Sequence, residues 1–179
     1  TAHYGETLSA GFNYTCAVLD NGSAMCWGYN QYGQLGDNTT GQKLTPVGVS
    51  GLQNAKTISV GRHHTCAALD NGTAMCWGYN QFGQLGDNTT VTPKATPGTV
   101  INLTNVRLNG INQSLAVTNV DGGTAPTARS GETLSAGDSH TCAVLDNGSA
   151  MCWGDQEFGR LGNDNITACL LYTSDAADE

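Results

Sequence analysis

Six cysteines are the residues whose type and spacing most plainly predict chemistry. They form three pairs, each with nine residues between its members: Cys16/Cys26, Cys66/Cys76 and Cys142/Cys152. An Asp-Asn-Gly segment divides each pair. A two-residue Asn-Gly turn would turn the two cysteines toward opposite faces of a sheet, whereas a three-residue loop with a left-handed glycine sets them directly opposite each other. The threefold recurrence favours the second register, and we predict three cross-strand disulfides.

Zinc binding and free buried thiols are the alternatives for the same cysteines. Structural zinc sites favour knuckles with two to four residues between the cysteines, and here each pair also belongs to a separate copy. A free thiol pair stays open at this stage. Disulfides would indicate an oxidising compartment, so we expect an extracellular, cell-surface or periplasmic protein. Each bridge closes a short loop and should add about 2–3 kcal/mol of stability.

Histidines next to the Thr-Cys segments are the candidates for acid–base chemistry. His63, His64 and His140 stand there, and His3 is an isolated surface candidate. The sequence spaces no carboxylate or nucleophile around them as catalysis would require. We therefore expect structural hydrogen bonding at a strand start. The chain is predicted to be no enzyme, with no catalytic residue and no cofactor.

The segment Gly-Gln-Leu-Gly-Asp-Asn-Thr-Thr occurs twice and offers oxygen ligands for calcium. It occupies 33–40 and 83–90. It lacks the alternating acidic pattern of a calcium loop. We expect Asp37 and Asn38 to cap a turn through side-chain to backbone hydrogen bonds, and we predict no metal site.

A tryptophan followed by a glycine marks each copy. The pairs are Trp27-Gly28, Trp77-Gly78 and Trp153-Gly154. One large ring and one glycine per copy are typical of packing between neighbouring copies, where the ring fills space and the glycine lets backbone approach. An aromatic binding site is the alternative.

All these residues belong to one repeat. Thr15–Gly28 returns as Thr65–Gly78 and as Thr141–Gly154. A repeat of this size is a supersecondary unit that must stack on its neighbours to bury a core. Short β-compatible runs bounded by Gly and Asn, without helical periodicity, predict four short antiparallel strands per copy. The sequence thus predicts an all-β fold of β-propeller blades, with the Trp-Gly pairs between blades.

Composition excludes several partners. The 179 residues include 15 acids and 7 bases, giving a net charge of −8. Phosphate backbones require clustered positive charge, so we expect no nucleic-acid partner. No apolar run is long enough to span a bilayer, so we expect no membrane insertion. The sequence shows no initiator Met and no signal peptide, which leaves the cysteines as the indicator of location.

The copies divide the chain unevenly. Leu103–Arg107 resembles Leu52–Lys56, and Leu115 stands where a cysteine is expected, which indicates a decayed half-copy. The end, Cys169–Glu179, matches no repeat and resembles a translated sequencing adapter; a natural disordered tail is the alternative. We predict a cysteine-paired blade at 1–58, a second at 59–102, a degenerate half-blade or insertion at 103–130, a truncated third cysteine-paired blade at 131–168 and a non-native tail at 169–179 that makes few contacts with the blades.

The segments Ser135–Gly148, Cys152–Gly154 and Asn30–Gly36 resemble repeats of the regulator of chromosome condensation family. The cysteine pairs resemble its bacterial secreted branch, and the resemblance covers about Gly5 to Gly162. It implies a β-propeller, typically of seven blades. Three cysteine-marked copies and a decayed half would form an incomplete ring, so we expect a fragment of a larger protein.

Founding members of that family exchange nucleotide on a small GTPase and bind chromatin, but fold alone does not supply function. A bacterial inhibitor of β-lactamases with similar architecture acts by protein binding. We therefore predict a non-enzymatic extracellular module that binds a protein or glycan partner through its blade loops. The alternatives are a spacer domain of a larger secreted enzyme or adhesin and, third, a guanine-nucleotide exchange factor.

Overall fold

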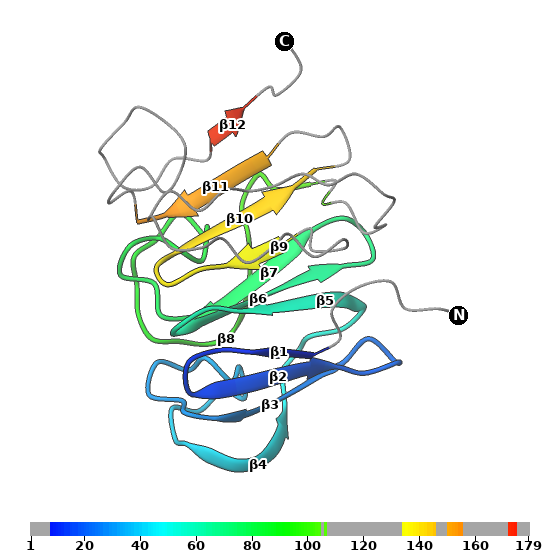
Figure 1. Ribbon diagram of the computed structural model, residues 1–179, viewed down its shortest axis with the longest axis vertical. Helices are drawn as coiled ribbons and strands as arrows, with labels where there is room; N and C mark the ends of the chain where they lie inside the picture. Colours follow the sequence, from blue (N-terminus) through cyan, green and yellow to red (C-terminus); the bar gives the residue numbers. More distant parts are fainter. Residues whose placement is uncertain (1–7, 105, 107–133, 146–149, 156–171, 175–179) are drawn as a thin grey trace.

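The computed structural model describes residues 8–104, 106, 134–145, 150–155 and 172–174. Within these ranges the regular elements are strands arranged as three four-stranded antiparallel sheets. Figure 1 shows the sheets following one another along the long axis of the molecule, in sequence order from blue to red. The all-β prediction of four-stranded antiparallel blades is confirmed.

Each sheet is a meander in which strands consecutive in the chain lie side by side. The first contains β1 (Leu8–Ala10), β2 (Tyr14–Val18), β3 (Ala24–Gly28) and β4 (Lys43–Gly48). The second contains β5 (Ala55–Val60), β6 (His64–Leu69), β7 (Ala74–Gly78) and β8 (Lys94–Thr99). The third contains β9 (Leu134–Ala136), β10 (His140–Val144), β11 (Ala150–Gly154) and β12 (Tyr172–Ser174). We call these sheets the first, second and third blade.

The β2–β3 hairpin has the three-residue loop that the cysteine spacing predicts. Leu19 N donates to Ser23 O at 2.8 Å, and Gly22 is left-handed with φ of 78°. Cys16 therefore lies directly opposite Cys26, and the same register recurs in the other two blades. The paired Cα atoms are 4.1 Å apart in all three copies, and the sulfur atoms are bonded. The predicted register is confirmed, and the cysteines lie at disulfide distance.

The cores lie between the blades. The first core joins Cys16, Leu35 and Val49 of the first blade to Ile58 and Trp77 of the second. β2 alternates buried and half-buried residues, whereas five consecutive residues of β6 are buried although its sequence is almost the same. Because β6 has a blade on each side and β2 has only one, position in the stack decides burial.

The blade boundary differs from the prediction. The boundary between residues 58 and 59 falls inside β5, and the second blade begins at Ala55. The crossing before it turns at Gly51 and Asn54, both with positive φ, and Ala55 N then donates to Gly22 O at 2.9 Å. This bond to the first hairpin fixes where β5 starts. The predicted half-blade 103–130 lies almost wholly outside the described residues, apart from buried Leu103 and Val106 at its start.

The prediction that the tail makes few contacts is wrong for Tyr172–Ser174. These residues form β12, which pairs with β11 so that Ser174 faces Ala150 and Tyr172 faces Cys152. An edge strand presents unpaired backbone N–H and C=O groups, and any extended segment can fill them whatever its side chains. The pairing therefore does not test where the tail sequence comes from, and Leu170 and Leu171 lie outside the described residues.

Candidate functional site

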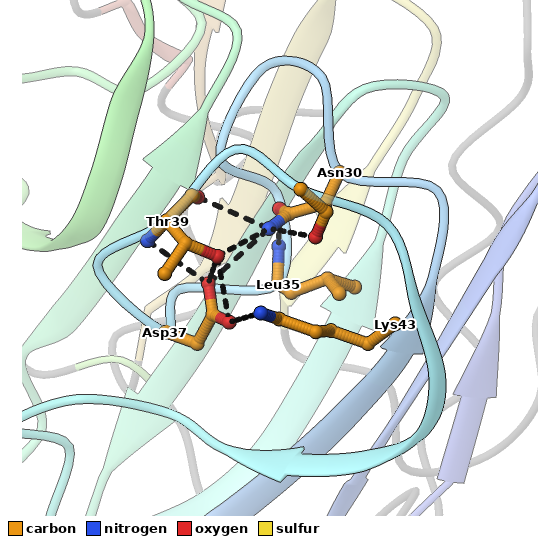
Figure 2. A network of polar contacts seen from close by, with 6 residues as sticks. Asn30, Leu35, Asp37, Thr39 and Lys43 are labelled. Atoms are coloured by element: carbon orange, nitrogen blue, oxygen red, sulfur yellow. Dashed lines mark hydrogen bonds and ion pairs between the residues drawn. The ribbon is translucent and has the colours of Figure 1, made fainter.

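Buried asparagines hold the loops that leave β3 and β7. Asn30 is fully buried, and its Nδ2 lies 3.0 Å from Thr39 O and 3.2 Å from both Gly41 O and Asp37 Oδ1. Its Oδ1 accepts from Leu35 N at 2.9 Å, so the amide spans the whole loop (Figure 2). Asn80 makes the corresponding contacts with Asp87, Thr89 and Leu85 in the second blade.

Asp37 closes the same turn. Its Oδ1 accepts from Thr39 N at 3.0 Å and from Thr39 Oγ1 at 2.7 Å, and its Oδ2 lies 3.3 Å from Lys43 Nζ (Figure 2). Burial raises the pKa of Asp37, but the hydrogen bonds from Thr39, Lys43 and Asn30 outweigh it and hold that pKa below its usual range. The predicted turn cap at Asp37 is confirmed.

Asn38 stabilises the same turn through its backbone conformation and its N–H group. It takes a left-handed φ of 63°, which asparagine tolerates, and its N donates to Ala95 O of the second blade at 2.9 Å. The loop that follows β3 is therefore held in shape by contacts within the chain, including one with the second blade. The described residues contain no cluster of His, Cys, Asp or Glu able to hold a metal ion.

A backbone carbonyl forms the polar centre of each blade junction. Gln34 O accepts from Trp77 Nε1 at 2.9 Å and from Thr65 Oγ1 at 2.8 Å, both in the next blade. Tyr14 Oη lies 3.1 Å from the same Thr65 Oγ1. At the second junction Gln84 O accepts from Trp153 Nε1 at 2.9 Å and Thr141 Oγ1 at 3.0 Å. Here His64 Nε2, 2.9 Å from Thr141 Oγ1, stands in the place of the tyrosine.

The three tryptophans predicted to pack between blades differ in burial. Trp77 and Trp153 are fully buried in the two junctions, whereas Trp27 is partly exposed. Gly28, Gly78 and Gly154 have φ between 109° and 118°. A Cβ at Gly78 would lie 2.6 Å from His63 O, so the close approach that requires glycine is chiefly inside a blade.

The histidines are structural where they are buried. His64 is fully buried, and burial, followed by the nearby His140 and His63, lowers its pKa to about 3. Burial and Arg62 also lower the pKa of half-buried His63. Both rings are therefore neutral at pH 7. His140 begins β10 in the same place, and His3 lies outside the described residues.

A row of partly exposed aromatic rings lies beside these loops, and we call it the aromatic row. It consists of Tyr29, Tyr32, His63, Tyr79 and Phe82. The ring centroids are 6.5 Å apart for Tyr29 and Tyr32, 4.8 Å for Tyr32 and Tyr79, and 6.1 Å for Tyr79 and Phe82. The row therefore crosses continuously from the first blade to the second.

This row was not predicted from the sequence, because tryptophan was the only aromatic residue considered for a binding site. The available signal was the recurrence of Tyr-Asn-Gln followed by an aromatic residue, at 29–32 and 79–82. Next to His63 in the chain, Arg62 lines a hollow of about 580 Å³ together with Phe12 and Asp138. Arg62 lies 5.6 Å over the Phe12 ring and 3.5 Å from Asp138 Oδ2.

Four-stranded antiparallel sheets that repeat along the chain and bury tryptophans between them define a β-propeller-type repeat protein. Two family models, each described as the regulator of chromosome condensation (RCC1) repeat, match residues 21–68 and residues 7–34, 55–84 and 133–160. Together they cover more than half of the sequence, and the chain belongs to the RCC1 repeat family.

Solved structures agree on the fold. Human WBSCR16 matches with a TM-score of 0.68 and 20% identity over 93% of this chain and 38% of that chain. Yeast RCC1 (Prp20) bound to Kap60 matches with a TM-score of 0.50 and 21% identity, over 90% of this chain and 46% of that chain. Prp20p from Saccharomyces cerevisiae matches with a TM-score of 0.51 and 22% identity, over 90% of this chain and 48% of that chain. At these identities the likeness shows the fold alone.

This chain spans less than half the length of each of these structures. No curated protein is similar enough in sequence to count as a relative. Among the described residues there is no helix of the length and apolarity needed to cross a membrane.

Proposed function

We propose that the chain is a non-enzymatic extracellular, cell-surface or periplasmic module that binds a protein or glycan partner through its blade loops. The observation that carries this proposal is the aromatic row, set on loops that Asn30 and Asn80 hold from inside. Aromatic side chains supply large contact areas, and a surface that is ordered before binding loses little conformational entropy.

The state of the polar groups supports a role without catalysis. A general base needs a pKa near the working pH and must reach its substrate. His64 is buried with a pKa near 3, and the carboxylates of Asp37 and Asp87 are held by Lys43 and Lys94 at 3.3 and 2.8 Å. These groups are engaged in structure.

The cysteine pairs support the oxidising location, because disulfides persist in secreted, surface and periplasmic proteins. The yeast structures are described with Kap60 and with binding to Gsp1p and histones, which are partners of those proteins. They support the use of this fold for protein binding. The net charge of −8 favours partners other than nucleic acid for this chain.

The test is binding of the oxidised, immobilised chain to arrays of proteins and of glycans. A variant with Tyr29, Tyr32, Tyr79 and Phe82 all changed to Ser is compared with Leu19→Ala. Leu19 is 42% exposed and belongs to the hairpin at the other end of the same strands. We expect the aromatic variant to lose binding and Leu19→Ala to keep it. Equal binding by both variants would rule out the aromatic row as the binding surface, and absence of binding by the unaltered chain would favour a spacer. Chemical conversion of a bound ligand would contradict the non-enzymatic role.

A further inference from the structure

The aromatic row contains the same small set of groups twice. In the first blade the Tyr29 hydroxyl donates to Gln31 Oε1, and in the second the Tyr79 hydroxyl donates to Gln81 Oε1. Both glutamines are exposed. Tyr32 and Phe82 stand in equivalent places, and Tyr32 packs against Tyr79 across the junction. Two equivalent subsites therefore lie side by side.

These subsites are uncharged. Their tyrosine, phenylalanine and glutamine side chains are neutral, and His63 between them is neutral at pH 7 because burial and Arg62 lower its pKa. The lysines that follow these loops, Lys43 at the start of β4 and Lys94 at the start of β8, are paired with Asp37 and Asp87. In the third blade Asp155 stands where Tyr29 and Tyr79 stand, so the neutral pattern is limited to the first two blades.

Such a surface suits a neutral ligand with both apolar and hydroxyl-bearing sides. Ring faces pack against the C–H groups of a pyranose, while tyrosine hydroxyls and glutamine amides donate and accept hydrogen bonds with sugar hydroxyls. The net charge of −8 disfavours an acidic polymer. Two like subsites side by side suit a ligand built from repeating units. A polysaccharide is such a ligand, whereas the surface of a globular protein does not repeat.

We propose that the aromatic row binds a neutral polysaccharide, with one subsite formed by Tyr29, Gln31 and Tyr32 and the next by Tyr79, Gln81 and Phe82. This rests on the proposed binding function and gives it a chemical class of ligand. The buried Asn30 and Asn80 networks hold both subsites in place before the ligand arrives, which limits the entropy lost on binding.

The experiment uses the full 179-residue chain with its disulfides formed, immobilised on a biosensor surface. The probes are three neutral polysaccharides, laminarin, mannan and amylose, and the acidic polygalacturonate. We expect binding to at least one neutral probe and weaker or no binding to polygalacturonate. Tyr32→Ala and Tyr79→Ala should each weaken binding about tenfold or more, as expected for aromatic anchors.

Three further variants separate ligand contact from loop structure. Tyr32→Phe should weaken binding less than Tyr32→Ala, because it keeps the ring and Phe82 occupies the equivalent place in the second blade. Leu44→Ala, at an 86% exposed residue of the edge strand β4, should bind like the unaltered chain. Gln31→Ala, which removes only an exposed partner of Tyr29, should weaken binding with the near-UV circular dichroism spectrum unchanged.

Each result decides one point. Binding of a neutral polysaccharide that is insensitive to all the aromatic and Gln31 variants overturns this inference, as does equal binding of polygalacturonate. Binding to a protein on the array but to no polysaccharide overturns the inference and leaves the proposed binding function standing. Binding to neither class of ligand overturns both.

Discussion

Asn30 is the residue on which the first loop depends. Its fully buried amide links the buried Leu35 N with Thr39 O and Gly41 O. Asn30→Ala would leave the buried Leu35 N without this partner and would remove the contacts with the two carbonyls, and we expect a loss of about 2–3 kcal/mol in the free energy of unfolding. Urea unfolding measures this loss of stability. Gln31→Ala, one residue along at an exposed position, should change stability by less than about 0.5 kcal/mol; similar losses for both variants would contradict the role given to Asn30.

His64 makes stability depend on pH. Its pKa is lowered to about 3 by burial and by the charges of His140 and His63, whereas an unfolded histidine titrates near 6.5. Between these values the unfolded chain binds the additional proton, so the free energy of unfolding should fall as pH falls from about 6.5 to 3, by up to about 1.4 kcal/mol per unit.

Urea unfolding at pH 7.5, 6, 5 and 4 tests this dependence. His64→Tyr is the matched variant, because Tyr14 occupies the equivalent place at the first junction. The variant should lose most of the slope between pH 6 and 4, and half-buried His63, whose pKa is also lowered, accounts for the remainder. Loss of stability through Asp37 and Asp87, whose pKa values are lowered too, belongs to more acidic conditions. An unchanged slope would assign the pH dependence to other groups.

At the scale of the strand, the end of each β-hairpin requires a glycine. Gly78 has φ of 109°, and a Cβ there would lie 2.6 Å from His63 O. Gly78→Ala should lower the free energy of unfolding by about 2 kcal/mol or more, through backbone strain and crowding. Gly98→Ala is the control, because its Cβ would meet its nearest atom, Cys76 O, at an ordinary 3.7 Å. Thermal unfolding measures both variants. An equal loss of stability in the two would show that β7 shifts to relieve the strain at Gly78.

The hairpins and turn caps were predictable because they depend on residues close in sequence. Cys16 and Cys26 are ten residues apart, and Asp37 caps a turn ending two residues later. The aromatic row and the hydrogen-bond acceptors of Trp77 and Trp153 were not predictable, because they depend on contacts between residues of different blades that lie far apart in the sequence. The pairing of β12 was not predictable either, since it depends on a backbone edge and not on side-chain pattern.

At the scale of the whole molecule, the described part of the first blade leaves apolar side chains exposed. Trp27 is partly exposed where Trp77 and Trp153 are buried, and Phe12 and Leu8 are 70% and 58% exposed. Exposed apolar surface promotes association. We expect the 179-residue chain on its own, produced in an oxidising host, to self-associate or to unfold with low cooperativity. Sedimentation velocity with thermal unfolding tests this, and a monodisperse monomer with a sharp transition would contradict it.

Each blade junction uses the same parts: a loop carbonyl, a threonine hydroxyl and an indole N–H. The acceptor is main chain, so it survives changes in the side chain that carries it. A gene duplication that adds one copy consequently adds one complete junction, and a recombination that deletes one copy rejoins compatible surfaces. Proteins built this way can change length in whole blades during evolution, while the side chains of the exposed loops diversify independently of the contacts that hold the blades together.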